Sequence, residues 1–220
     1  ALNPVVYKKL PYDAIKDFTG VTLTTIVPQV VVVNQDVPVK TIPELIAYTK
    51  ANPGKVSFGS AGQGASNHLS GELLNAMGGI KMQHVPYKGD APSIVDLIGG
   101  QIQLALPTTV AGLPHVRSGK LRAIGVTSKK RLDSLPDVAA VAETLPGYEA
   151  VSWGGVMVPA GTPKEIVNRL NVEINKILKM PDVAAKLENL GAIIVGSTPE
   201  EFDKYVKDEI AKWGKVARDN

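Results

Sequence analysis

The segment GSAGQGASNHLSGE, from Gly59 to Glu72, is the part of the sequence whose residue types and spacing favour chemistry with a ligand. It follows a strand-like run and opens a helical pattern, so free N–H groups and the positive end of a helix dipole meet at one point. Glycines leave its backbone open to a ligand and serines add hydroxyl donors, at Gly59, Gly62, Gly64, Ser60 and Ser66. These features predict a site for a carboxylate or a phosphate. A strand-to-helix turn capped by Ser66 explains the same residues equally well.

Sharper motifs are absent from the sequence. GQGASN lacks the third glycine of a dinucleotide fingerprint, IKMQHV offers no acid, and no G-K-[ST] marks a P-loop. His68, His84 and His115 lack the spacing and the nearby acids of a zinc site. Ser66 and His68, two residues apart in a helix, cannot face each other as nucleophile and base, so His68 is interpreted as a first-turn residue hydrogen-bonded to the loop. We therefore expect no enzyme activity, no metal and no cofactor.

The composition is that of a globular chain without a nucleic-acid partner. Its 220 residues are 44% hydrophobic and 20% charged, enough for one large domain or two small ones. The formal net charge is only +3 and the lysines are dispersed. No apolar run has the length of a membrane span, and the first residues, ALNPVVYKKLPYD, lack the pattern of a signal peptide. The chain has no cysteine, which is compatible with cytosol and periplasm alike.

Strand-like runs alternate with amphipathic helical patterns through the middle of the chain. Leu23 to Asn34 is β-branched and nearly all apolar, as a strand covered on both faces would be, with a break at Pro28. Thr41 is the expected cap of a helix, with Glu44 three residues on. Further strands are expected in KVSFGS, KMQHVPY, IQLALP and LRAIGVTS, and further helices in SNHLSGELLNAMGG, DAPSIVDLIGGQ and LPHVRSGK. This alternation predicts a parallel sheet covered by helices.

The pattern loosens after Thr127 and then returns to strand and helix. A connecting segment with a short helix around Val138 to Thr144 precedes an apolar, glycine-rich strand from Val151 to Thr162. Thr162 is the expected cap of the next helix, with Pro163 in its first turn. One apolar stripe of this helix contains Ile166, Leu170, Ile174, Ile177 and Leu178. In the last helix, from Thr198, the face formed by Phe202, Tyr205, Val206, Ile210 and Trp213 is expected to pack in the core.

Several long motifs occur in an order that resembles one known family. They are KKLPYD, ELIAYTKANPGKVSFGSAGQGASNHLSGELL, HVPYKGDAPSIVDLIGGQIQ, LPHVRSGKLRAIGVTSKKR and PAGTPKEIVNRLN. Over essentially the whole chain, the sequence is similar to the tripartite tricarboxylate transporter substrate-binding proteins, the TctC-like or Bug family. The resemblance implies an α/β fold of the periplasmic binding protein type II kind, with two lobes of parallel-rich sheets flanked by helices. Residues 1–29 and 150–220 would form the first lobe and residues 30–149 the second, joined by the strands Leu23 to Asn34 and Val151 to Pro159.

The resemblance also implies where a ligand binds. In that family, backbone amides from one loop of each lobe hold the ligand carboxylate. The second-lobe positions are Ser60, Ala61, Gly62, Gly64, Ala65 and Ser66, with His68 just inside the helix. Lys88, as a partner for a second carboxylate, and Thr108 are further candidates, although an exposed lysine is more commonly solvated. The chain reads ALPTTV where family members often carry an acid, which favours a simple dicarboxylate or an aromatic acid over a ligand with an amino group.

The chain departs from the family at its beginning. Family members start with a signal peptide, a first strand and a PGG-type loop that supplies the first-lobe half of the pocket, and the sequence lacks the matching segment. The first lobe is therefore expected to be incomplete, with apolar faces of the last helices uncovered. A second copy of the chain that exchanges this element, giving a homo-oligomer, is one way to fill the gap.

The predicted function is that of a periplasmic solute-binding protein. It would capture a di- or tricarboxylate or an aromatic acid and deliver it to the membrane subunits of a tripartite tricarboxylate transporter. Two alternatives stay open: a truncated family member that keeps only a half-site without transport function, and an α/β enzyme that acts on a small acid. Stabilisation by ligand without turnover indicates the first function, weak or absent binding the second, and consumption of substrate the third.

Overall fold

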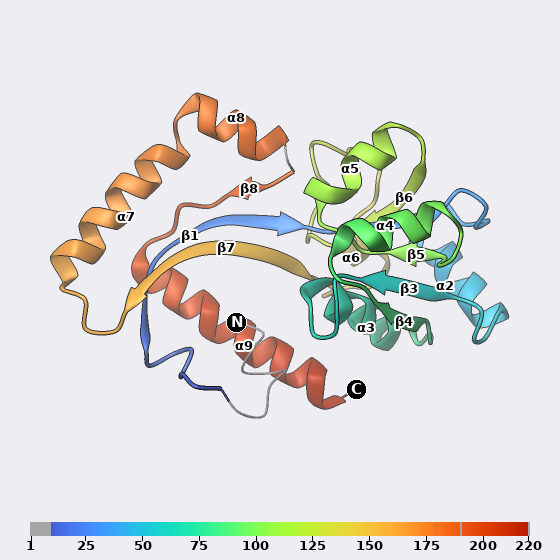
Figure 1. Cartoon of the computed structure of the whole chain (residues 1–220), viewed down its shortest axis with the longest axis horizontal. Coiled ribbons are helices and arrows are strands. Elements are labelled where there is room, and N and C mark those ends of the chain that lie inside the picture. The colour runs from blue at the N-terminus through green and yellow to red at the C-terminus, as the bar shows by residue number, and fades with distance from the viewer. Residues whose placement is uncertain (1–9, 190, 220) are drawn as a thin grey trace. The chain divides into compact units, whose positions relative to one another are not determined.

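A computed structural model of the chain describes residues 10–189 and 191–219, with side chains described through Gly214 (Figure 1). The strands are β1 (Phe18–Pro28), β2 (Val30–Asn34), β3 (Ser57–Ser60), β4 (Gln83–Pro86), β5 (Leu104–Ala105), β6 (Leu121–Val126), β7 (Val151–Pro159) and β8 (Ile193–Ile194). The helices are α2 (Ile42–Ala51), α3 (Ser66–Gly78), α4 (Asp90–Ile98), α5 (Thr109–Arg117), α6 (Val141–Thr144), α7 (Lys164–Leu178), α8 (Pro181–Asn189) and α9 (Pro199–Asp219).

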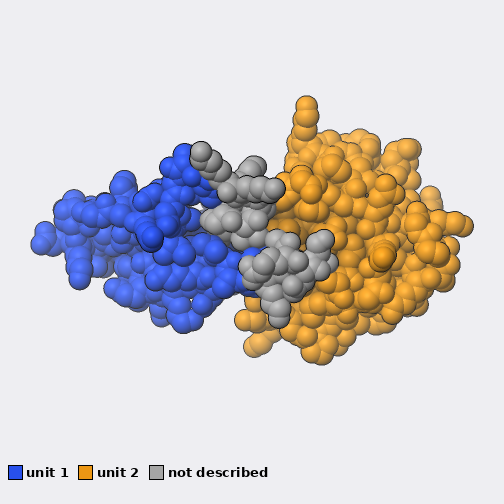
Figure 2. Space-filling view, turned by 90° about the horizontal axis from the view of Figure 1, so that it is seen from below, with its two compact units in different colours: residues 1–27, 153–220 blue, residues 28–152 orange. Residues whose placement is uncertain are grey.

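The chain divides into two compact units, coloured separately in Figure 2. Unit 2 is the continuous segment Pro28–Ser152. Unit 1 combines the chain up to Val27 with the chain from Trp153 onward. The polypeptide therefore enters unit 2 after β1 and leaves it at the start of β7.

The sheet of unit 2 has the strand order β4-β3-β5-β2-β6. β3 pairs in parallel with β4 and β5, whereas β2 runs antiparallel to both β5 and β6. The sheet is thus parallel apart from β2, as expected for the parallel-rich sheet that the resemblance implies. Although α2 connects β2 to β3, the two strands are not neighbours in the sheet and run in opposite directions.

The break predicted at Pro28 is confirmed. β1 ends at Pro28 and β2 begins at Val30. Between them, the backbone N–H of Gln29 donates to Oγ1 of Thr127 (2.8 Å), and the carbonyl of Gln29 accepts from the N–H of Thr127 (3.0 Å). Proline carries no N–H for a strand ladder, so the regular pairing of β1 ends at this residue.

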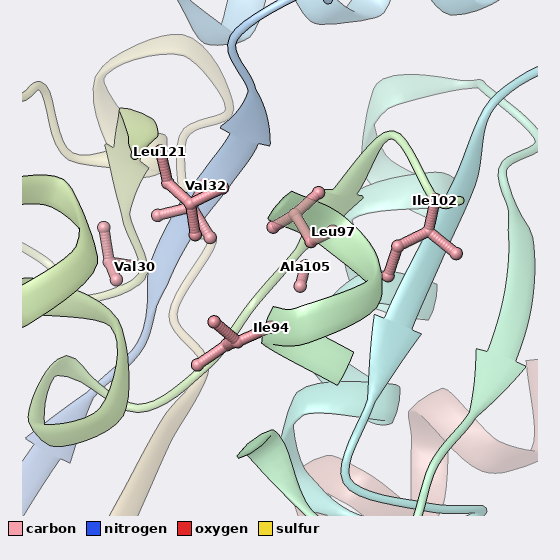
Figure 3. Packing of buried hydrophobic residues seen from close by; sticks show 7 residues of the cluster. All are labelled: Val30, Val32, Ile94, Leu97, Ile102, Ala105 and Leu121. Carbon is pink, nitrogen blue, oxygen red and sulfur yellow. The ribbon is translucent and has the colours of Figure 1, made fainter. Parts of the chain in front are cut away.

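Unit 2 has an apolar core on both faces of β2. The four valines from Val30 to Val33 are fully buried. Figure 3 shows Ile94 and Leu97 of α4 packed with side chains of β2 and its neighbours, in a cluster that also contains Val30, Val32, Ile102, Ala105 and Leu121. Burial of a side chain of this size stabilises the fold by about 1.5–3 kcal/mol, so this core fixes the position of the strand ends.

Two helix starts illustrate how local sequence sets the boundaries. Thr41 caps α2 as predicted, because its Oγ1 accepts the N–H of Glu44 (3.3 Å). The predicted cap at Thr162 is wrong: α7 begins at Lys164, with Pro163 as its N-cap residue. The hydroxyl of Thr162 instead donates to the carbonyl of Pro159 (2.8 Å), so the preceding turn uses the group that a cap would need.

Unit 1 contains a small sheet and the last helices. Its strand order is β7-β1-β8, and β8 is antiparallel to β1. The predicted apolar face of α9 is buried at Phe202, Val206 and Trp213. Phe202 and Val206 pack against Leu23 of β1 and Trp153 of β7, so α9 covers this sheet.

The predicted stripe of α7 is largely exposed. Ile166, Leu170 and Ile177 keep 50%, 37% and 49% of their surface accessible, whereas Leu178 is buried. The core of unit 1 therefore uses Phe202, Val206 and Trp213 of α9 and only part of the stripe of α7, in agreement with the expectation of uncovered apolar surface on a late helix. Within the part of the chain that the structure describes, no helix combines the length and the apolar character required to cross a bilayer.

Candidate functional site

Several strands of unit 2 end at one edge of the sheet, where the predicted site residues gather. β3 ends at Ser60 and the parallel strand β4 ends at Pro86. Thr108 follows β5 and forms a bridge with Gln29 at the start of the antiparallel strand β2. Ligands of open α/β sheets bind outside the carboxyl ends of the parallel strands, so this edge is the candidate site.

The loop between β3 and α3, residues 61–65, is named the anion loop. Gly62 and Gly64 have φ angles of 139° and 74°, which other residues rarely adopt. A Cβ at Gly62 would also lie 3.3 Å from the carbonyl oxygen of Tyr87. Both glycines are therefore required by the backbone itself, whatever the loop binds.

Most amides of the anion loop have acceptors within the loop, in α3 or at the end of β3. Those of Ala61, Gly62, Gly64 and Ala65 donate to Asn67 Oδ1, Ser60 Oγ, His68 Nδ1 and the carbonyl of Gly62, each at 3.1 Å. The first three amides of α3, on Ser66, Asn67 and His68, have no acceptor among the described residues. The donors available to an anion are thus shifted from the loop to the first turn of the helix.

Ser66 does not cap the helix, so the cap considered from sequence is wrong, whereas the glycines do serve the turn geometry. Ala65 is the N-cap residue, with φ −67° and ψ 159°, and it provides no side-chain cap. Ser66 is the first residue of α3, and its Oγ lies 2.8 Å from Oγ of Ser152. Either hydroxyl can donate in this pair, which leaves Ser66 free to turn its proton toward a carboxylate.

Two histidines lie directly beside the anion loop. The rings of His68 and His84 stack with centroids 3.8 Å apart, and the ring of Phe58 lies 5.1 Å from that of His84 at an interplanar angle of 31°. Nε2 of His84 lies 2.6 Å from Oγ of Ser60. The interpretation of His68 as a first-turn residue hydrogen-bonded to the loop is confirmed by its bond to the amide of Gly64. The stacked pair could not be deduced from the sequence, where the two rings are separated by a helix and a turn.

Both imidazoles favour their neutral forms. Burial, and to a lesser extent the nearby His68, lower the pKa of His84 from its ordinary 6.5 to about 4. Burial also lowers the pKa of His68, against a smaller opposite effect of Glu72, whose carboxylate lies 3.7 Å from its Nε2. At neutral pH the pair therefore adds hydrogen-bonding capacity to the site without adding charge.

A second network was missed by sequence analysis. Nδ2 of Asn67 donates to Oδ1 of Asp90 (2.7 Å), and the N–H and hydroxyl of Thr108 lie 3.3 and 3.2 Å from Oδ2 of Asp90. Asp90 is in the first turn of α4, where acids are common because of the helix dipole, so its type alone signals nothing further. The signal that was overlooked is positional, since β4 and β5 end at the same edge of the sheet. Thr108 therefore holds a carboxylate of the protein itself.

Lys88 and Gln29 complete the polar residues at this edge. Lys88 is exposed, and within the described part of the chain it forms no hydrogen bond or ion pair, so its role stays a prediction. The next residue, Gly89, donates its N–H to the carbonyl of Ala61 (3.1 Å), which holds this turn next to the anion loop in space. The side chain of Gln29 is fully buried, and neither its Nε2 nor its Oε1 has a partner among the described residues.

A pocket of about 540 Å³ lies elsewhere in unit 2. Its lining comes from the end of α2, the end of α3 and the start of β4: Thr49, Lys50, Pro53, Gly54, Gly79, Ile80, Lys81, Met82 and Gln83. These positions are at the opposite edge of the sheet from the anion loop, and none of them was predicted to bind ligand. Among the described residues, no three histidine, cysteine, aspartate or glutamate side chains gather as a metal site.

A pH titration of stability tests the environment of His84. Because the folded-state pKa is lowered, His84 stabilises the fold above pH 6.5, and this contribution is lost as the pH falls from 6.5 toward about 4. We expect the free energy of unfolding from urea curves to decrease over this interval. His84→Gln, which keeps a polar group for Ser60 but does not titrate, is expected to show a smaller decrease. Equal slopes for the two proteins would contradict the assigned environment.

Comparison with known proteins gives a consistent match. A model of the family described as tripartite tricarboxylate transporter family receptor matches residues 1–220. The UPF0065 protein in the tcbD-tcbE intergenic region of Pseudomonas sp. (strain P51) is 39% identical over 212 residues, which are 96% of this chain and 63% of the relative. The chain thus spans less than two thirds of the length of this relative.

Solved structures match over nearly the whole chain. Rpa4515 of R. palustris with adipate has a TM-score of 0.90 at 37% identity, over 99% of this chain and 73% of its own. The periplasmic binding protein BugD has a TM-score of 0.87 at 33% identity, over 99% and 74%. MatC (Rpa3494) of Rhodopseudomonas palustris with bound malate has a TM-score of 0.85 at 30% identity, over 98% and 75%. The α/β fold described above is that of these periplasmic binding proteins.

Proposed function

The chain belongs to the tripartite tricarboxylate transporter receptor family, and we propose that it acts as a periplasmic solute-binding protein that captures a small organic carboxylate. One observation carries the proposal: the unpaired first-turn amides of α3 converge beside the hydroxyl of Ser66, at the end of β3. Proteins of this family are solute-binding receptors and not enzymes.

The physical basis is the recognition of one negative charge by fixed dipoles. The amides of Ser66, Asn67 and His68 point out of the helix start, where the macrodipole places partial positive charge. Hydrogen bonds from neutral donors to a carboxylate are shorter and stronger than those to a neutral acceptor. Because the anion loop is already held by its own hydrogen bonds, little ordering is required when the ligand arrives.

A dicarboxylate is the proposed ligand class. Adipate and malate, in the two structures named above, are both dicarboxylates. Lys88, next to the anion loop in the turn before α4, is the proposed partner of the second carboxylate. Asp90 already accepts hydrogen bonds from Asn67 and Thr108, and its negative charge near this edge disfavours a third carboxylate beside it.

The wider role belongs to the whole protein and is proposed with it. We propose that units 1 and 2 correspond to the two lobes, residues 1–29 with 150–220 and residues 30–149, and that the loaded protein delivers its ligand to membrane subunits of a tripartite transporter. Ser60, Ala61, Gly62, Gly64 and Ala65 would act by holding the helix start in place, and Thr108 by anchoring Asp90.

A thermal-shift series tests the carboxylate site. Adipate, malate, citrate and benzoate are the probes, and inorganic phosphate is the control anion. A ligand at a hundred times its Kd stabilises the folded state by roughly 2.7 kcal/mol, which a melting curve resolves. We expect stabilisation by one or both dicarboxylates. A cooperative melt that no acid shifts would contradict the proposal and favour the alternative of a chain that retains only a half-site.

Variants at Ser66 separate the hydroxyl from the amide. Ser66→Ala removes the hydroxyl, and Ser66→Pro also removes the N–H at a helix position that accepts proline, after an Ala65 that is already extended. Because a hydrogen bond to a charged group contributes about 1.5–3 kcal/mol, we expect calorimetric affinity to fall at least tenfold with alanine and further with proline. Ser152→Ala breaks the same Ser66–Ser152 bond from the other side and is expected to leave affinity nearly unchanged. Equal losses for all three variants would mean that the serine pair acts only through the fold.

A further inference from the structure

We infer that the stacked pair His68–His84 is the positioning device of the anion loop, that it works only while both rings are neutral, and that it makes carboxylate binding sensitive to acid. This inference rests on the proposed function, since it concerns the regulation of the same site. Neither ring is assigned a contact with the ligand, so both act through the loop.

The first contact of the pair holds the end of the loop. Nδ1 of His68 accepts the N–H of Gly64 at 3.1 Å. Gly64 has a φ of 74°, a conformation that other residues rarely adopt. The bond links the loop to the first turn of α3, which carries the unpaired amides of Ser66 and Asn67. An acceptor on residue 68 is therefore needed to keep the loop folded against the helix.

The second contact of the pair holds the beginning of the loop. Nε2 of His84 lies 2.6 Å from Oγ of Ser60, and that oxygen accepts the N–H of Gly62 at 3.1 Å. Ser60 is fully buried, so its orientation is set by these partners and by the carbonyl of Gly62, also at 3.1 Å. His84 on β4 and His68 on α3 thus hold the two ends of one loop.

The stack couples the two contacts. The ring centroids of His68 and His84 are 3.8 Å apart with an interplanar angle of 28°, and the ring of Phe58 lies beside both, 5.1 Å from His84 and 6.5 Å from His68. Two positive charges at this separation, away from bulk water on the side of Phe58, repel each other strongly. At most one ring of the stack can be positively charged without the two rings separating.

The groups that face the pair determine which ring responds first. Glu72, from the same helix as His68, lies 3.7 Å from Nε2 of His68 and favours a proton there. β3 contributes Phe58 and Ser60, neither of which is charged in the acidic range. Neutral His68 therefore carries its proton on Nε2, toward Glu72, and keeps Nδ1 as the acceptor for Gly64. A second proton must go to Nδ1. Nδ1 then becomes a donor and can no longer accept the N–H of Gly64.

Acid is thus expected to open the loop through His68. Burial lowers the pKa of both rings, so the change occurs below the ordinary histidine range and the pair is neutral at pH 7. Once Gly64 loses its acceptor, the bond from the N–H of Ala61 to Oδ1 of Asn67 is the side-chain link that still ties the loop to α3, and the unpaired amides are held less firmly in one arrangement. The predicted result is a receptor that holds its ligand at neutral pH and releases it in acid.

The test compares pH profiles of adipate affinity for three proteins at pH 7.5, 6.5, 5.5 and 5.0, by isothermal titration calorimetry. His68→Asn places a non-titrating amide oxygen where Nδ1 lies, and His68→Phe keeps a ring for the stack without an acceptor. For the unsubstituted chain we expect a fall of roughly tenfold from pH 7.5 to pH 5.0 beyond the change shown by His68→Asn. Protonation of adipate affects all three proteins alike and cancels in this comparison. His68→Phe is expected to bind roughly tenfold more weakly already at pH 7.5.

The outcomes separate this inference from the proposed function. Parallel profiles of the unsubstituted chain and His68→Asn, with full affinity at pH 7.5, would overturn the inference and leave the carboxylate site intact. If no protein binds adipate or malate at pH 7.5, the proposed function fails, and the pair is then decided without ligand by NMR. In that measurement the amide chemical shift of Gly64 is expected to follow the titration of the His68 ring. A Gly64 chemical shift that does not change with pH would overturn the inference. If His68→Phe does not fold, His68→Asn decides alone.

Discussion

Replacing Gly71 by alanine is expected to lower the free energy of unfolding of unit 2 by about 2 kcal/mol or more. Gly71 lies within α3, and a Cβ there would overlap the ring of Phe58, whose Cζ and Cδ2 would be 2.6 and 2.7 Å away. Phe58 is fully buried, so its ring has no free space to move into. In an unobstructed helix the same substitution would stabilise by up to about 1 kcal/mol, so steric overlap decides the sign.

Gly78 provides the matched control in the same helix. The nearest atom to a Cβ at Gly78 is Cγ1 of Ile46 at 3.4 Å, an ordinary contact, so Gly78→Ala is expected to be neutral or stabilising. Urea unfolding followed by far-UV circular dichroism measures both variants. Gly71→Ala with Phe58→Leu is expected to recover part of the loss, because the shorter side chain makes room. A Gly71→Ala protein as stable as Gly78→Ala would show that Phe58 is not fixed where it packs.

The second large effect is expected in unit 1, where Phe202→Ala should cost about 3–5 kcal/mol. Phe202 is fully buried beneath Leu23 and Val206, and its ring meets Trp153 edge to face at 5.6 Å. Gly155 of β7 leaves the space that the ring occupies, since a Cβ there would lie 2.8 Å from two of its carbons. Truncation to alanine therefore removes the apolar contacts through which α9 packs against β1 and β7.

Tryptophan fluorescence reads this effect selectively. The chain has two tryptophans, Trp153 and Trp213, and both belong to unit 1. We expect the fluorescence transition of Phe202→Ala to move to lower urea concentration. Unit 2, followed by circular dichroism, is expected to unfold at a higher urea concentration. Ile166→Ala, at a side chain that is half exposed, is the control and should change stability by less than about 0.5 kcal/mol. A shift for Ile166→Ala as large as that for Phe202→Ala would contradict the assigned core.

Patterns confined to one element were predicted well from sequence. The valines of β2, the break at Pro28 and the cap at Thr41 depend on residues a few positions apart, and all are confirmed. The direction of β2 could not be predicted in the same way, because it depends on its partners β5 and β6, which are far from it in sequence. The stripe of α7 was recognised as apolar, but periodicity does not say whether another element covers Ile166 or Ile177.

The candidate site shows the same limit more sharply. Sequence predicted a glycine-rich loop before a helix, and the positive φ angles of Gly62 and Gly64 explain those glycines. It did not predict which amides remain unpaired, since that depends on side chains such as Asn67 that fold back onto the loop. It also could not bring His84 against His68, because a β4 residue and an α3 residue meet only once the sheet exists.

The two ends of unit 2 meet at a single residue. The N–H of Thr127 donates to the carbonyl of Gln29 at the first end, and the carbonyl of Thr127 accepts the N–H of Ala150 near the second end, at 3.0 and 3.1 Å. A module whose ends lie side by side is suited to insertion into a host loop and to circular permutation, because neither operation stretches its backbone. Joining Ser152 to Pro28 by a short linker would therefore give a circular form of unit 2, which contains the anion loop together with His68 and His84.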